Sequence, residues 1–196
     1  MTSLLLVRHA DVGPAYRGRL VGSADVPATR AGLAELTRLR PLLRELRPDA
    51  CLVSPCQRTR QSWRVLRAGH SLSRPAVVEP LLREIDFGQY ELRSFDELAA
   101  ADPDLARRWQ RPDFAFPGGE SLAAFHRRLD TLLTTLEQAP AEKILLVTHG
   151  GVIRHLLCRL LGVDPANYLL FSPRYAGLTC IEHVHQGHGV LTAFNL

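Results

Sequence analysis

The amino-acid sequence predicts an α/β fold with three layers, in which a mainly parallel central sheet carries helices on both faces. Short runs of Leu, Ile and Val alternate along the chain with longer segments whose apolar residues recur every three or four positions. Runs that are apolar throughout are expected of parallel strands covered on both faces, and the longer segments are typical of helices with one exposed face. Strands that alternate with helices in this way favour a parallel sheet.

The first half of the chain supplies three predicted strands and two predicted helices. Leu4–Val7 is the first strand, and "ACLV" at 50–53 and "AVVE" at 76–79 are the second and third. Leucines spaced at three and four predict a helix over residues 30–47, which Pro41 is expected to kink or split. A second helix is predicted from about Pro55 to residue 67, directly after the second strand.

The second half continues this alternation and ends in a hairpin. Residues 95–109 are predicted to be helical, with a break at Asp102-Pro103, and 121–137 form an amphipathic pattern typical of a helix. Residues 143–148 predict another buried strand, with a helix following over 151–161. The tail segments "LTCIEHV" and "VLTAFNL" flank a turn and predict a β-hairpin.

Length and composition are those of a single globular domain spanning residues 1–196, in which 92–118 is a candidate lid over an active site. No apolar run approaches the ~20 residues of a membrane span, and the first residues lack the features of a signal peptide, so a cytoplasmic location without membrane contact is expected. The sequence does not determine the oligomeric state.

The charge pattern indicates the class of partner. The formal net charge is +4, and Lys143 is the only lysine, so the positive charge is almost entirely arginine. These arginines are spread along the chain without interleaved aromatic residues, which disfavours nucleic-acid binding. Arginine forms paired hydrogen bonds with phosphate and carboxylate, so the balance suits a small anionic substrate.

The cysteines and clustered histidines do not predict a metal site. The four cysteines form no CxxC pair, and those within apolar segments, Cys51 and Cys158, are predicted to be small buried hydrophobes, as suits a reducing compartment. In the tail, His183 and His185 alternate on a predicted strand, but a metal needs more ligands in fixed geometry, so a polar hairpin is favoured.

Two strands end in the same way, in "LLLVRHA" at 4–10 and "ILLVTHGG" at 144–151. Ligands of open α/β sheets bind beyond the carboxyl ends of the strands, so His9 and His149 are expected to share one crevice. Arg8 precedes the first histidine, and Arg58 lies in the first turns of the helix after the second strand. Gly150 opens a helix, where close backbone approach and unpaired N–H groups favour an anion.

This set of side chains suits a phosphoryl group. Arginine meets phosphate oxygens with charge-assisted hydrogen bonds, and a neutral histidine is a competent nucleophile. The flanking cations should lower the pKa of His9 and keep it neutral, so that attack on phosphorus would give a phosphohistidine. Departure of an alkoxide needs a proton, for which the segment 80–91 offers Glu84 slightly ahead of Asp86 because of its apolar neighbours.

Five segments, "LLLVRHA", "SPCQRTRQS", "LLREIDFGQYE", "GGES" and "LLVTHGGVIRHLL", resemble in order and spacing the histidine phosphatase superfamily. The resemblance spans roughly residues 4–157 and is to the phosphoglycerate mutase-like branch, with α-ribazole phosphatase-type phosphatases. It implies a phosphoglycerate mutase-like fold, a phosphomonoesterase that acts on a small phosphorylated metabolite through a phosphohistidine, and no metal or organic cofactor. It also implies roles for individual residues: the nucleophile His9, the proton donor Glu84, and the phosphate ligands Arg8, Arg58 and His149.

The chain departs from the family pattern after the first histidine. Ala10 stands where the family usually has glycine and would be strained if its φ were positive. Val12 and Ala15 stand where many members carry threonine and asparagine, so one phosphate ligand of the family is missing. Arg17 or Arg19 is the hypothesised replacement, which would bind substrate together with the Gly150 backbone.

Two alternative functions remain open at this point. A phosphoglycerate mutase-type phosphoryl transferase is disfavoured because 92–118 is short for a segment that must seal the site from water. A non-catalytic module that binds phosphorylated ligands is disfavoured because a binder needs no proton donor. Trp109 is expected to line the substrate mouth if 94–116 forms a lid. The helix residue His155 is interpreted as structural or exposed, while His70 and His126 carry no functional signal.

Overall fold

The computed structural model describes residues 2–68, 72 and 74–196, and it contains the predicted sheet. The six strands are β1 (Thr2–Arg8), β2 (Ala50–Val53), β3 (Val77–Val78), β4 (Lys143–Thr148), β5 (Leu178–His185) and β6 (His188–Ala193). They lie in the order β3-β2-β4-β1-β5-β6. The four strands from β3 to β1 are parallel, whereas β5 and β6 pair antiparallel. The mainly parallel sheet and the terminal hairpin are thus confirmed.

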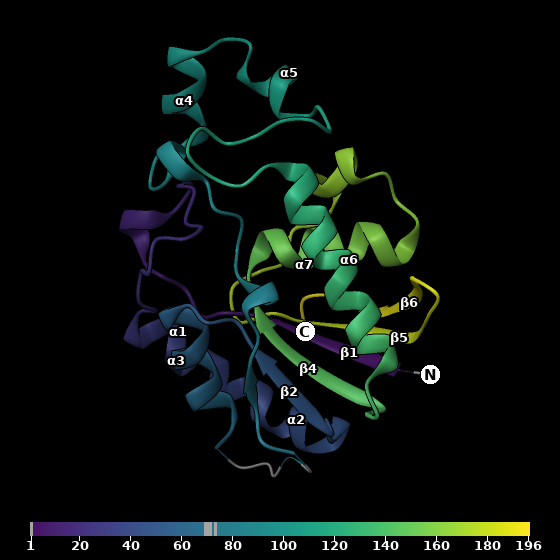
Figure 1. Ribbon diagram of the computed structural model, residues 1–196. Coiled ribbons are helices and arrows are strands. Elements are labelled where there is room, and N and C mark those ends of the chain that lie inside the picture. Colours follow the sequence, from purple (N-terminus) through teal and green to yellow (C-terminus); the bar gives the residue numbers. More distant parts are fainter. Residues whose placement is uncertain (1, 69–71, 73) are drawn as a thin grey trace.

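Helices cover both faces of the sheet and complete the predicted three layers (Figure 1). On one face lie α1 (Arg30–Glu35), the 3-10 turn η2 (Leu36–Leu39), α2 (Arg40–Leu46) and α3 (Gln57–Leu66). On the other face lie α6 (Leu122–Gln138) and α7 (Gly150–Leu161). The predicted split of the 30–47 helix is confirmed, but the chain switches to η2 before Pro41, which then occupies the first turn of α2.

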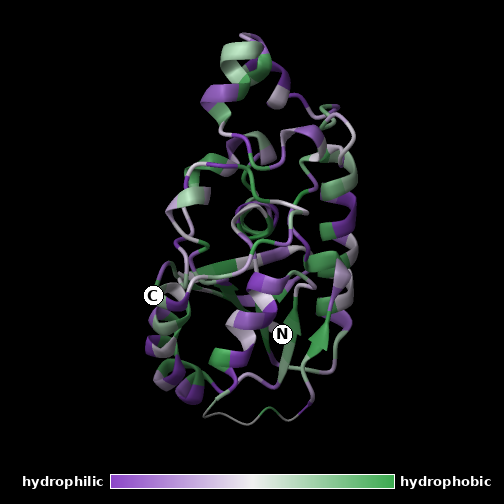
Figure 2. Cartoon of the chain, turned by 90° about the vertical axis from the view of Figure 1, so that its left-hand side faces the viewer, coloured by the Kyte–Doolittle hydropathy of each residue, from purple (hydrophilic) through white to green (hydrophobic). Residues whose placement is uncertain are grey.

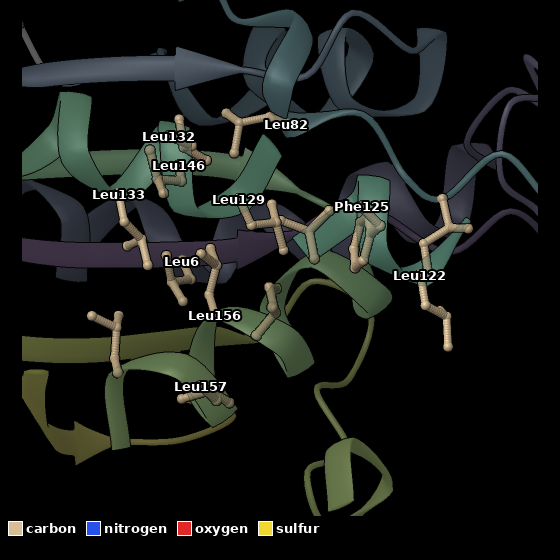
Figure 3. Packing of buried hydrophobic residues seen from close by; sticks show 14 of the residues in the cluster. Leu6, Leu82, Leu122, Phe125, Leu129, Leu132, Leu133, Leu146, Leu156 and Leu157 are labelled. Atoms are coloured by element: carbon tan, nitrogen blue, oxygen red, sulfur yellow. The ribbon is translucent and has the colours of Figure 1, made fainter. Parts of the chain in front are cut away.

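The core lies in two layers because consecutive side chains of a strand point to opposite faces. Leu4 and Leu6 of β1 pack with apolar residues of α6 and α7, whereas Leu5 and Val7 pack with leucines of the opposite helices. Figure 3 shows Leu6 and its neighbours packed between the strands and α6 and α7. In Figure 2 the strands are coloured mostly hydrophobic and the helices carry both colours, as expected when only one helix face is buried.

A helical excursion separates β3 from α6 and lies apart from the sheet (Figure 1). It contains α4 (Phe95–Ala101) and α5 (Leu105–Trp109), and the break between them falls at the predicted Asp102-Pro103. Ser94 begins α4 with a capping box. Trp109 stacks on Phe114 at 5.8 Å between ring centroids and contacts Phe116 edge-on. This aromatic cluster packs α5 against the segment that follows it.

The cysteines and tail histidines also have described places. All four cysteines are free, and Cys51 and Cys158 are buried as predicted. In the β5–β6 hairpin, His183 has a φ of 55° beside an irregularity in the strand pairing, so it does not continue the regular alternation with His185. His70 lies outside the described residues. Among the described helices, none combines the length and apolar character needed to cross a membrane.

Candidate active site

Parallel pairing of β1 with β4 brings the two predicted histidines together. Arg8 is in register with Thr148, so His9 and His149 follow at the same edge of the sheet. Their ring centroids are 5.2 Å apart, with the planes inclined at 63°. The prediction that two imidazoles distant in sequence meet at one place is confirmed.

His9 is almost fully buried, and its tautomer follows from one hydrogen bond. Its Nδ1 lies 2.8 Å from the carbonyl oxygen of Ala10, which can only accept, so in the neutral ring Nδ1 carries the proton and Nε2 the lone pair. Burial, with Arg58 and Arg8 as nearby cations, holds the pKa of His9 well below its usual range. Ala10 is not among the positive-φ residues, so the strain that a positive φ would cause is absent, and its N–H donates to Ser62.

Arg8 is held by a turn near the other end of the chain. One terminal nitrogen donates to the carbonyl of Pro173 at 2.8 Å, and the guanidinium carbon lies 3.7 Å from the centroid of the Tyr175 ring. A Cβ on Gly150 would lie 3.2 Å from the same carbon, so the guanidinium also lies close to the start of α7. The Arg8 Nε is buried without a hydrogen-bond partner. A fixed cation with an unused donor is suited to an anion.

Arg58 and His149 are fully buried, and both are committed to protein partners. Arg58 donates from Nε to Nδ1 of His149 at 3.2 Å, which leaves the His149 proton on Nε2, 2.7 Å from the hydroxyl of Ser54. Burial, then the positive charge of Arg58, holds the pKa of His149 well below its usual range. The terminal nitrogens of Arg58 donate to carbonyls of the loop 21–24, with distances of 2.8 to 3.2 Å.

The same loop is bound on its N–H side by a carboxylate. Glu91 accepts from the backbone nitrogens of Gly22, Ser23 and Ala24 at 3.1, 2.8 and 3.3 Å. A Cβ on Gly22 would collide with the Ile85 carbonyl, so the close approach requires glycine. The loop 21–24 is therefore clamped between a cation and an anion.

Glu84 follows the 3-10 turn η3 (Pro80–Leu82) and is 8% exposed. Its carboxylate accepts from the backbone nitrogen of Gly151 at 2.9 Å. A buried Arg128 supports this segment from behind, since it donates to the carbonyls of Leu81 and Glu84. Its Nε and Nη2 also donate to the Glu120 carboxylate at 2.8 and 2.9 Å. Asp86, the alternative donor, instead accepts from Ser23 and Gly88, and it does not line the cavity described next.

A cavity of about 450 Å³ opens beside these groups. Arg8, His9, Glu84 and Gly150 line it, whereas Arg58 and His149 do not. Val12 also lines it, but Ala15 is exposed elsewhere.

The two arginines proposed to replace a family ligand lie differently. The Arg17 side chain is 75% exposed beside Asp11 and lies outside the cavity lining. Arg19 lines the cavity, but its guanidinium donates to the Leu92 carbonyl and to Glu97. Within the described part of the chain, no group of three or more His, Cys, Asp or Glu side chains could hold a metal ion.

Comparison with known families accounts for this arrangement. Residues 4–196 match the model described as the histidine phosphatase superfamily (branch 1). The chain belongs to the histidine phosphatase superfamily. The family predicted from the five sequence segments is therefore confirmed, and so is the phosphoglycerate mutase-like α/β fold.

Several phosphatases are similar to this histidine phosphatase over nearly their whole length. The adenosylcobalamin/alpha-ribazole phosphatase of Salmonella typhimurium is 29% identical, with 98% of this chain and 95% of that protein covered. A putative phosphoserine phosphatase 2 of Hydrogenobacter thermophilus is 28% identical, covering 93% and 90%. The crystal structure of the alpha-ribazole phosphatase from Shigella flexneri superposes with a TM-score of 0.85 at 28% identity, covering 100% and 96%.

The cavity of this histidine phosphatase is also lined by residues whose place there the sequence does not fully indicate. Tyr175 stacks on Arg8, lies 5.4 Å from the His9 ring and lines the cavity, yet nothing in its local sequence indicates this place. His155, interpreted as structural or exposed, is buried, stacks on Tyr168 at 4.9 Å and also lines the cavity. Trp109 lines the cavity, as the lid hypothesis requires.

Proposed function

We propose that this histidine phosphatase hydrolyses phosphomonoesters of small metabolites in two steps, through a phosphohistidine on His9. The observation that carries the proposal is the state of the His9 ring. Its Nδ1 is tied to a backbone carbonyl and its pKa is depressed, so Nε2 has a lone pair at neutral pH. The ring lines a cavity that Arg8 also lines, and the Nε of this arginine is buried without a hydrogen-bond partner.

In the first step, Nε2 of His9 attacks phosphorus and the bond from phosphorus to the ester oxygen breaks. Glu84, in its protonated form, gives its proton to the departing oxygen, which leaves as an alcohol. Arg8 binds the phosphoryl oxygens as negative charge gathers on them, which is where most catalysis of phosphoryl transfer arises. The support for these roles is that all three side chains line one cavity.

In the second step, the Glu84 carboxylate takes a proton from water as that water attacks phosphorus. The phosphorus–nitrogen bond breaks, phosphate leaves, and His9 and Glu84 return to their starting protonation states. The bond from the Gly151 N–H holds the carboxylate at the start of α7, next to the cavity, in both steps.

Arg58 and His149 are proposed phosphate ligands that must exchange partners. Arg58 would release one of the carbonyls of loop 21–24, and His149 would turn its Nε2 proton from Ser54 to a phosphoryl oxygen. Until such an exchange, the contribution of Arg58 is electrostatic, since its charge adds to the effect of burial in lowering the pKa of His9.

The cellular setting and the role of the helical excursion are further parts of this proposal. A cytoplasmic location is supported by four free cysteines, which suit a reducing compartment. A lid role for 92–118 in a single domain is supported by Phe95 and Trp109, which line the cavity from α4 and α5.

The decisive experiment traps the intermediate. Enzyme is mixed with a ³²P-labelled alkyl phosphate, quenched in alkali, and digested to locate the label, with phosphate release followed in parallel. We expect base-stable label on His9, stoichiometric release of phosphate, and no label in the His9→Gln variant. Ligand binding without label or release would establish a binding module instead, and transfer to an added phosphoglycerate without phosphate release would establish a mutase.

A further inference from the structure

The cavity beside His9 is larger than a phosphoryl group needs. At about 450 Å³ it falls within the range of roughly 300–1,000 Å³ that is typical of sites for whole small molecules. Beyond Arg8 and His9 its walls become apolar, with Phe87, Phe95 and Trp109 on one side. The space next to the phosphoryl site is therefore shaped by side chains that would contact the leaving group.

The second apolar wall comes from the 3-10 segment η5 (Pro165–Leu170), which contributes Tyr168 and Leu169. Leu169 is 65% exposed and Phe95 is 39% exposed, although both line the cavity. Exposed apolar side chains gathered at the mouth of a cavity mark a surface that a ligand covers. The two walls come from α4–α5 and from η5, which are far apart in the sequence and line the same cavity.

The ring positions on the lid side are fixed by mutual packing. Trp109 lies 5.8 Å from Phe95 and 6.3 Å from Phe87, in tilted arrangements. On the η5 side, the ring of Tyr168 is stacked on His155, with planes 19° apart. Preformed aromatic surfaces suit another ring, since aromatic pairs favour offset stacked or edge-to-face contacts.

Besides the arginine at the phosphoryl end, the cavity offers a carboxylate on the leaving group two arginines, of which one is already paired. Three arginines line it: Arg8 at the phosphoryl end, Arg19, which is paired with Glu97, and Arg154, which donates from Nε to the Phe171 carbonyl. A substrate carboxylate would thus depend on Arg154. It would also leave the exposed apolar walls uncovered.

We infer that the leaving group of the substrate carries a planar, uncharged ring system that lies between the α4–α5 wall and η5, rather than a short carboxylated chain. This inference rests on the proposed phosphatase function and adds the class of ester to it. Contact with the exposed Phe95 and with Tyr168, together with cover of Leu169, would supply the binding, and His9 would receive the phosphoryl group from the end of the molecule nearest the sheet.

The test uses esters whose leaving alcohols have similar acidity, so that chemical reactivity does not decide the result. Naphthylethyl phosphate is compared with ethyl phosphate and phosphoglycerate by phosphate release. We expect the kcat/KM of the naphthylethyl ester to exceed both others by about tenfold or more, since burial of a ring removes a large apolar area from water. A kcat/KM that is equal or higher for phosphoglycerate would overturn the inference while leaving the phosphatase function intact. Failure to release phosphate from any ester would refute the function itself.

Neighbouring leucines provide a matched pair of variants. Leu169 lines the cavity, whereas Leu170 is 73% exposed and does not. Leu169→Ser should reduce the preference for the naphthylethyl ester over ethyl phosphate severalfold, and Leu170→Ser should leave that preference unchanged. Arg154→Gln should also leave it unchanged. A preference lost equally in both leucine variants, or lost only in Arg154→Gln, would refute the ring-binding site.

Discussion

Replacement of Gly151 by alanine tests whether the Glu84 carboxylate must stay where the start of α7 holds it. A Cβ at this position would overlap one carboxylate oxygen and lie 3.1 Å from the carboxylate carbon. Carbon atoms pack at about 3.5–4.0 Å, so the carboxylate must retreat by about half an ångström and weaken its bond from the Gly151 N–H. Because a 1 Å misplacement can cost about a hundredfold in rate, we expect kcat for alkyl phosphates to fall about ten- to a hundredfold.

The assay compares two leaving groups in four proteins. p-Nitrophenolate departs without a proton, so Gly151→Ala should affect p-nitrophenyl phosphate less than ethyl phosphate. In a Glu84→Ala background the obstructing carboxylate is gone, so adding Gly151→Ala should have little further effect. An equal loss on both substrates, or a full loss on the Glu84→Ala background, would show that the new methyl group acts on the cavity and not through Glu84. Thermal unfolding of each variant controls for stability, and alanine is the better helix former.

Three further outcomes are expected. Tyr175→Leu should weaken inhibition by inorganic phosphate about two- to thirtyfold because Arg8 loses its cation–π partner, whereas Tyr175→Phe should stay near wild type; equal loss in both would exclude the ring contact as the cause. Burial lowers the pKa of His155 from 6.5 to about 4, so the unfolded chain takes up a proton first as pH falls. As the pH falls from 6.5 to about 4, this group should therefore lower the free energy of unfolding by up to about 3 kcal/mol. Urea unfolding at a series of pH values should show a flatter dependence of this free energy on pH in His155→Phe, and an unchanged dependence would contradict this. Glu120→Gln leaves Arg128 buried without its carboxylate partner and should lower the free energy of unfolding by about 3–5 kcal/mol in urea, with a loss below about 1 kcal/mol counting against that role.

The parts of the fold that sequence could predict are those governed by local periodicity. The strand at 143–148 coincides with its prediction, and the break at Asp102-Pro103 appears between α4 and α5. The meeting of His9 and His149 was also predictable, because buried parallel strands present their carboxyl ends at one edge. The split before Pro41 came earlier than expected, since the ring of a proline is tolerated within the first turn of a new helix.

What sequence could not predict are contacts between segments that share no local pattern. Arg8 and the carbonyl of Pro173 are 165 positions apart, and the turn that holds Tyr175 against the guanidinium is defined only when β5 pairs with β1. The partners of Arg58 were equally hidden, because backbone carbonyls are present at every residue and carry no sequence signal. The cavity walls from α4–α5 and η5 likewise depend on how separate segments pack.

The clamp on loop 21–24 has a consequence for how the specificity of this enzyme can change. Backbone groups of this loop are hydrogen-bonded to Arg58 or to Glu91, and Val21 also lines the cavity. The backbone there is consequently a fixed frame, and only the side chain mounted on it is variable. Libraries that exchange residues 20 and 21 should yield altered ester preferences with intact turnover. An insertion or deletion within 21–24 should displace the buried guanidinium of Arg58 and abolish the activity of His9.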